Sequence, residues 1–128
     1  MGDTSSLIVA PLLGFLEALN EQNLDAISDH VGTRFQVPGG TMRLEGVLDA
    51  ASRLWERLPD ARVEIVSLTT EADRVAWEWR IRSSQLEIPL GGMSLSRISD
   101  GKVTESRSYY DSAALRQDGV ERLEPLPL

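Results

Sequence analysis

The spacing of apolar residues changes once along this chain, near Pro59, and that change limits the folds open to it. Before Pro59, apolar residues recur every three or four positions, which is the period of an amphipathic helix. After it they recur at every second position, which is typical of strands with one buried face. Helices followed by a run of strands favour an α+β fold with an antiparallel sheet.

Three helices are predicted from the first period. The first covers about 7–19, with Pro11 either in its first turn or at a kink. A short second helix begins after Asn23, whose side chain can cap it, and Gly32 is placed to end it. The third helix covers about 47–58. All three have one apolar face, so we expect them to pack on a sheet.

The strands are separated by turn residues. Asp100-Gly101 is a strong hairpin signal, because both residues tolerate the positive φ of a tight turn. A turn is also expected at 38–40, and a bend near 89–92. The predicted strands cover 34–37, 62–70, 74–83, 86–98 and 102–110.

The strand at 74–83 alternates most cleanly. Charged side chains occupy one face, and we expect them on the outer face of the sheet together with Glu105 and Arg107. A mixed apolar and charged outer face is a plausible two-fold interface, so the sequence predicts a homodimer through the sheet. Val75, Trp77, Trp79 and Ile81 form the apolar face.

Length and composition exclude several classes. The 128 residues favour one domain over 1–128, with a core at about 7–117 and a tail at 118–128 that we expect to drape over the surface. A net charge of −7 without a basic stripe disfavours nucleic acid and anionic membranes as partners. The chain has no cysteine, one histidine, no membrane-length apolar run and no phosphate-binding glycine loop. We therefore expect a cytoplasmic protein with no metal and no cofactor.

The segment Ser99–Asp111, which contains Asp-Gly-Lys-Val and then Tyr-Tyr-Asp, resembles the final hairpin of the SnoaL-like family. Gly46 and the Pro38-Gly39 turn fit the same family, which belongs to the NTF2-like (nuclear transport factor 2-like) superfamily. The resemblance covers about 7–117. It implies an NTF2-like/cystatin-like curved antiparallel sheet packed on three N-terminal helices in the order ααβαββββ, forming a cone with a central pocket.

The catalytic carboxylates of this superfamily are missing at the positions that the resemblance assigns to them. Ser108 stands where epoxide hydrolase-like members and SnoaL-type cyclases have an acid. The remaining Arg and Asp positions of the hydrolase set fall near Trp79 and Ile81. The two acids of ketosteroid isomerase-like members correspond to Val37 and Ser94. Hydrolase and ketosteroid isomerase chemistry is therefore disfavoured.

Three residues are candidates for proton transfer or hydrogen bonding in catalysis. His30 carries an imidazole, a side-chain type suited to proton transfer near neutral pH, although it can equally serve as a helix-end residue. Asp111 can orient a base or cap a short helix that follows it. Tyr110 can stabilise an enolate if its face of the last strand points into the cone, or it can be a core aromatic.

The candidate ligand-binding residues are aromatic, sulfur-containing or hydroxyl side chains expected on the inner side of the cone. They suit a flat, hydrophobic ligand, and core filling is the alternative for the aromatic ones. They are Trp77, Trp79, Phe15, Met93, Ser106 and Ser108.

Two functions fit these residues. The first is a cyclase or isomerase that acts on a small hydrophobic, polyketide-like natural product, largely by shape and orientation and with at most one acid or base. The second is a non-catalytic ligand-binding or accessory module in dimeric form, which the loss of the known catalytic sets favours.

Overall fold

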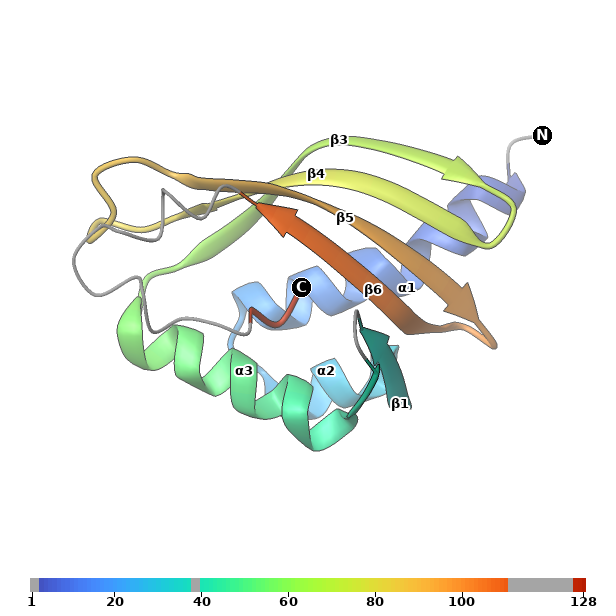
Figure 1. The fold of residues 1–128 in the computed structure, drawn as a ribbon, viewed down its shortest axis with the longest axis horizontal. Helices are drawn as coiled ribbons and strands as arrows, with labels where there is room; N and C mark the ends of the chain where they lie inside the picture. Colours follow the sequence, from blue (N-terminus) through green and yellow to red (C-terminus); the bar gives the residue numbers. More distant parts are fainter. Residues whose placement is uncertain (1–2, 38–39, 111–125) are drawn as a thin grey trace.

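The computed structural model describes residues 3–37, 40–110 and 126–128. Three helices and six strands follow one another in the order ααββαββββ (Figure 1). They are α1 (Asp3–Asn20), α2 (Leu24–His30), β1 (Val31–Val37), β2 (Gly40–Arg43), α3 (Leu44–Arg57), β3 (Arg62–Glu71), β4 (Arg74–Arg82), β5 (Leu90–Ser99) and β6 (Lys102–Tyr110).

The helices differ from prediction mainly at their ends. Helix α1 begins at Asp3 and runs through Pro11, so this proline lies inside the helix instead of near its start. Asn23 caps α2 as predicted, because its side-chain oxygen accepts a hydrogen bond from the Ala26 amide at 3.1 Å. The prediction that Gly32 ends α2 is wrong. The helix ends at His30 in extended backbone, and Gly32 is already part of β1.

The six strands form one mixed sheet in the order β2-β1-β6-β5-β4-β3. The predicted antiparallel sheet needs two corrections, because β1 pairs with β6 in parallel and β2 is an additional edge strand. Strand β5 begins at Leu90, four residues later than predicted. The long strands β3 to β6 cover one side of the molecule, and the three helices lie on the other (Figure 1).

The β5–β6 hairpin carries a bulge that decides which residues point inward. Asp100 and Gly101 both have positive φ, as the predicted turn requires. Ile98 pairs with Val103, but Arg97 pairs with Glu105, so β6 contains one extra residue at Thr104. Since side chains alternate along a strand, this extra residue moves all later β6 side chains to the opposite face.

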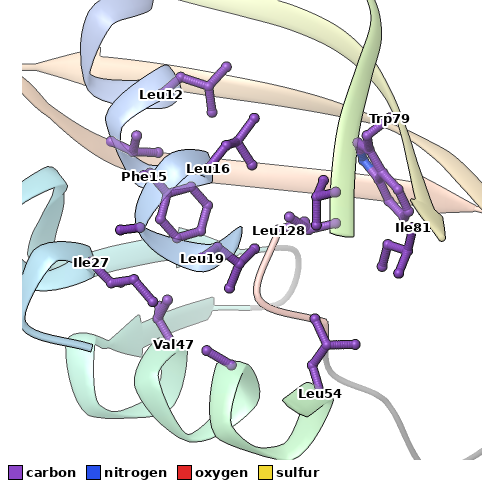
Figure 2. Close-up of a cluster of buried hydrophobic side chains, with 14 of the residues drawn as sticks. Leu12, Phe15, Leu16, Leu19, Ile27, Val47, Leu54, Trp79, Ile81 and Leu128 are labelled. Atoms are coloured by element: carbon purple, nitrogen blue, oxygen red, sulfur yellow. The ribbon is translucent and has the colours of Figure 1, made fainter. Parts of the chain in front are cut away.

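The hydrophobic core lies between the sheet and the helices (Figure 2). Helix α1 contributes Leu12, Phe15, Leu16 and Leu19, each at most 5% exposed. Helices α2 and α3 and strand β4 close this core from the other sides. Their contributions are Ile27, Val47, Ala51, Leu54, Val75, Trp77, Trp79 and Ile81.

Asn20 ties the end of α1 to the start of β3. Its side-chain amide donates to the Val63 carbonyl at 2.9 Å, and its oxygen accepts from the Val63 amide at 2.8 Å. We expect Asn20→Ala to lower the free energy of unfolding by about 1–3 kcal/mol, because both main-chain groups lose their partner in a half-buried place. Gln22→Ala removes an exposed amide that donates to the Pro59 carbonyl, and it should cost less than about 0.5 kcal/mol. Urea unfolding of both variants measures the difference, and equal losses would contradict the assignment.

Asp60 holds the segment that follows β4. The hydroxyl of Ser83 and the amide of Ser84 donate to its carboxylate, and these hydrogen bonds lower the pKa of Asp60 from 3.8 to about 2. A carboxyl whose folded-state pKa is lowered stabilises the fold above its unfolded pKa, and this contribution disappears as the pH falls through about 2. We therefore expect Asp60→Asn to be less stable than the parent at pH 6, with the gap closing between pH 4 and 2. Thermal unfolding against pH measures it, and a gap that does not depend on pH would contradict it.

Candidate functional site

The two inward tryptophans of β4 are fully buried and hydrogen bonded. Trp77 is 1% exposed and Trp79 is 0% exposed, so each indole N–H needs a partner inside the protein. Trp77 Nε1 donates to Ser96 Oγ at 3.0 Å, and Trp79 Nε1 donates to Ser94 Oγ at 2.8 Å. Each acceptor is displaced by two residues from the tryptophan's direct cross-strand partner, so both indoles lean along the neighbouring strand.

The serines of β5 face serines of β6. Ser94 lies opposite Ser108 with 2.7 Å between the hydroxyl oxygens, and Ser96 lies opposite Ser106 at 3.4 Å. This pairing depends on the extra residue at Thr104, because an uninterrupted hairpin would place Ser94 opposite Arg107. The face of β6 that carries the two serines therefore points inward, as the sequence predicts for Ser106, Ser108 and Tyr110.

One serine of each pair donates a hydrogen bond to the main-chain oxygen of Leu128. Ser106 Oγ donates to this oxygen at 2.9 Å and Ser108 Oγ at 2.6 Å. Leu128 is 5% exposed and lies among core residues that include Leu16 and Trp79 (Figure 2). The expectation that the tail drapes over the surface is thus wrong for residues 126–128. Leu126 and Leu128 pack in or against the core, because removing apolar surface from water lowers the free energy of the folded state.

We use the name serine network for Trp77, Trp79, Ser94, Ser96, Ser106 and Ser108. All six side chains are uncharged, and three of the four serines are at most 4% exposed. The charged side chains of the same strands lie on the outer face, where Glu105 pairs with Arg97 at 3.5 Å and with Arg107 at 3.2 Å. This outer position of Glu105 and Arg107 is the predicted one. Hydrogen bonds, and not ion pairs, therefore hold the side chains of the network together in apolar surroundings.

Tyr110 extends the aromatic part of the inner face. Its ring centre lies 6.2 Å from that of Trp79 with the planes tilted by 52°, a favourable aromatic arrangement. The side chain is half-buried. Asp111, the next candidate, lies outside the described residues.

His30 lies apart from the serine network. Its imidazole packs on α1 at Gly14, where an added Cβ would come within 2.5 Å of the ring. It lines a small depression of about 250 Å³ between α1 and α2, together with Glu17 and Glu21. No residue of the network lines this depression. The structure thus does not bring His30 together with Tyr110. His30 is the last residue of α2, which is the position expected of a helix-end residue.

The two other predicted ligand contacts lie in different places. Phe15 is 2% exposed and belongs to the core between the helices (Figure 2). Met93 is 47% exposed and pairs with Glu78 and Tyr109 on the outer face, so the expectation that it lies inside the cone is wrong. The reason is strand phase, since Met93 is the neighbour of the inward Ser94 and must point the other way. Together with Tyr109 and Tyr110 it lines an open depression of about 530 Å³ where β5 begins and β6 ends.

Within residues 3–37, 40–110 and 126–128, no three His, Asp or Glu side chains converge in a way that could hold a metal ion. The helices of the same ranges are all too short or too polar to cross a membrane.

Part of the serine network could have been found in the sequence. Ser94 and Ser96 precede the Asp100-Gly101 turn with a spacing of two, and Ser106 and Ser108 follow it with the same spacing. Two such pairs around a hairpin turn indicate cross-strand contacts. The roles of Ser94 and Ser96 were nevertheless missed, because without the bulge the two pairs do not share a face.

Three helices on one side of a mixed six-stranded sheet form the α+β fold that the resemblance to the SnoaL-like family implies. The model of the family "SnoaL-like polyketide cyclase" matches residues 10–119. The chain therefore belongs to the SnoaL-like family. No curated protein sequence matches it.

Solved structures agree with this fold. IdmH from Streptomyces antibioticus, a proposed polyketide cyclase, has a TM-score of 0.74 at 17% identity over 84% of this chain and 94% of its own. TerC, crystallised with polyporic acid, reaches 0.73 at 16% identity over 90% and 98%. AclR from Streptomyces galilaeus, a proposed hydroxylase, reaches 0.71 at 22% identity over 94% and 97%. At these identities the likenesses establish the fold, and the chemistry must be argued from the site.

Proposed function

We propose that this chain is a cyclase or isomerase that binds a small hydrophobic, polyketide-like molecule between the sheet and the helices. The observation that carries the proposal is the inner face of β4 to β6, where Trp77, Trp79 and Tyr110 stand beside buried serine hydroxyls. An apolar aromatic wall with a few fixed hydrogen-bonding groups is typical of small-molecule sites. Membership of the SnoaL-like polyketide cyclase family supports the same reading.

Ring closure of a polyketone suits such a wall because it needs no co-reactant. A carbon next to one carbonyl gives a proton to solvent water, and the resulting enolate carbon attacks a second carbonyl of the same molecule. One C–C bond forms, the C=O π bond becomes an oxyanion, and the oxyanion takes up a proton. The product is an isomer of the substrate. A protein can favour this reaction by holding the two reacting carbons together, which lowers the barrier by several kcal/mol.

The test uses a linear poly-β-ketone thioester, which also cyclises slowly without a catalyst. We expect the protein to accelerate ring closure and to change the distribution of ring isomers, measured by absorbance and by chromatography with mass detection. Heat-denatured protein at the same concentration is the control. An unchanged rate together with an unchanged product distribution would contradict cyclase activity on this class of substrate.

A non-catalytic ligand-binding module is the second candidate. It is favoured by the serine network, which contains neither an acid nor a base, and by Leu128, which fills the space beside it. Native mass spectrometry of the purified protein, combined with the cyclisation assay, distinguishes the enzyme from the non-catalytic binding module. A molecule that co-purifies and stays chemically unchanged during incubation supports the binding module, whereas turnover supports the enzyme.

The homodimer through the sheet remains a proposal, supported by two exposed apolar residues on the outer face. Met93 is 47% exposed and Tyr109 is 62% exposed, and they are cross-strand partners. We expect a dimer by light scattering, and a monomer after Met93→Lys combined with Tyr109→Lys, since charges inside an apolar contact oppose association. Thr69→Lys on β3, another exposed position, is the control and should remain dimeric. A monomeric parent protein would contradict the proposal.

A further inference from the structure

We infer that Ser106 and Ser108 form a binding site for the oxygen of a carbonyl-type group (a ketone, its enolate or a carboxylate), and that the main-chain oxygen of Leu128 occupies this site in the structure. The inference rests on the proposed function for the identity of the substrate. The chemistry of the site follows from its hydrogen bonds.

The direction of each hydrogen bond follows from counting protons. A serine hydroxyl has one proton, an indole N–H can only donate, and a main-chain carbonyl oxygen can only accept. Ser108 gives its proton to Leu128, so its oxygen must accept the proton of Ser94. Ser94 has then used its own proton and accepts from Trp79. The first chain of donors therefore runs from Trp79 through Ser94 and Ser108 to Leu128.

The second chain has the same order. Trp77 donates to Ser96, Ser96 donates to Ser106, and Ser106 donates to Leu128. Both chains thus end on one oxygen, at 2.6 Å from Ser108 and 2.9 Å from Ser106. Ser106 is buried and Ser108 is half-buried. Two hydroxyl donors that converge on a single point are an arrangement that stabilises an oxyanion.

Three of the four serines in the two donor chains are shielded from water. Ser94 and Ser96 are each 2% exposed and Ser106 is 4% exposed, so water competes little for these hydroxyls. In such surroundings each hydrogen bond polarises the next along a chain. Trp77, Trp79, Ser94 and Ser96 are therefore positioning residues, because they aim the protons of Ser106 and Ser108 without contacting the ligand oxygen.

Leu128 shows which ligand the site accepts. Its oxygen accepts two hydrogen bonds, and its side chain belongs to the same buried core as Leu16, Trp79 and Ile81 (Figure 2). A ligand with a carbonyl group on an apolar ring would accept both hydrogen bonds and place its ring in the apolar surroundings. A hydrocarbon of the same shape would leave the buried hydroxyl of Ser106 and the half-buried hydroxyl of Ser108 without an acceptor, and that costs free energy. A ligand in this position must displace residues 126–128, so the tail competes with it.

The experiment measures binding of α-tetralone, a bicyclic aromatic ketone, and of tetralin, the same ring system without oxygen, by tryptophan fluorescence. Three proteins are compared: the full chain, a variant that lacks residues 126–128, and that variant with Ser106→Ala and Ser108→Ala. We expect the shortened variant to bind the ketone about ten-fold more tightly than tetralin, and more tightly than the full chain does. The double substitution should abolish the preference for the ketone and leave tetralin binding within about two-fold.

A shortened variant that does not prefer the ketone, or that binds it no better than the full chain, would overturn the inference. If circular dichroism shows that the shortened variant is unfolded, Leu128→Ala in the full chain replaces it. This variant keeps the main-chain oxygen but weakens the apolar contacts of the tail, so ketone affinity should still rise. An unchanged affinity would overturn the inference equally. Because no turnover is measured, failure of the proposed cyclase reaction would leave this result intact, and the reverse also holds.

Discussion

Replacement of Gly92 by alanine is expected to lower the free energy of unfolding by about 1–3 kcal/mol, the usual cost of overpacking a core. An added Cβ at Gly92 would lie 2.4 Å from Cζ2 of Trp79 and 2.7 Å from Cη2. The indole is 0% exposed and its N–H is bound to Ser94, so it has little room to move. Urea unfolding measures the loss, and the tryptophan fluorescence of the folded state should change with it.

Gly91→Ala is the matched control. It changes the neighbouring residue of the same strand, where the nearest atom to an added Cβ is the Trp79 carbonyl oxygen at 3.8 Å. Alanine fits there, and the smaller entropy of the unfolded chain should make the variant neutral or more stable by up to about 1 kcal/mol. Equal stability of the two variants would show that the indole does not lie on Gly92, and the geometry of the serine network would then be wrong.

The second large effect is expected on turnover. If Ser108 donates to the oxyanion of ring closure, Ser108→Ala should lower kcat by about 100-fold with a smaller change in KM, because the lost hydrogen bond is strongest in the transition state. The poly-β-ketone thioester assay measures both constants. A large rise in KM at constant kcat would instead assign Ser108 to substrate binding alone, and would contradict a role in stabilising the oxyanion.

Two further variants serve as a control and as an intermediate case for Ser108→Ala. Ser99→Ala removes an exposed hydroxyl from the same hairpin and should leave kcat within about two-fold. Trp79→Phe keeps an aromatic ring but removes the N–H that sets the direction of Ser94 and Ser108. Its kcat should fall between those of the parent and Ser108→Ala, since the final donor remains but loses its orientation. Tm values establish that each variant is folded at the assay temperature.

Much of the fold is readable from the sequence because the local signals agree with the final structure. The period-two alternation at Val75–Ile81 predicts β4, and Asp100-Gly101 predicts the last hairpin. Strand β2 was missed because Gly40–Arg43 is short and mostly exposed, so it has no alternating apolar pattern. The parallel pairing of β1 with β6 depends on contacts between distant segments, which no local pattern reveals.

The candidate site was only partly predictable, for physical reasons that differ between residues. The burial of Trp77 and Trp79 follows from alternation. Met93 was assigned to the wrong face because the bend before β5 hides the phase of that strand. The donor chains could not be predicted, since they require the bulge at Thr104 and the return of Leu128 into the core. Neither feature leaves a periodic signal in the sequence.

The infrared carbonyl stretch of bound α-tetralone reports whether Ser106 and Ser108 bind a carbonyl-type oxygen. Hydrogen bonds to a carbonyl oxygen lower its stretching frequency. We expect a frequency below that of the ketone in water when the ligand is bound to the protein at saturation. With Ser106→Ala and Ser108→Ala, the frequency should rise towards its value in an alkane. The same frequency in both proteins would show that the ketone oxygen lies away from the two serines, and the serine network would then not be a carbonyl site.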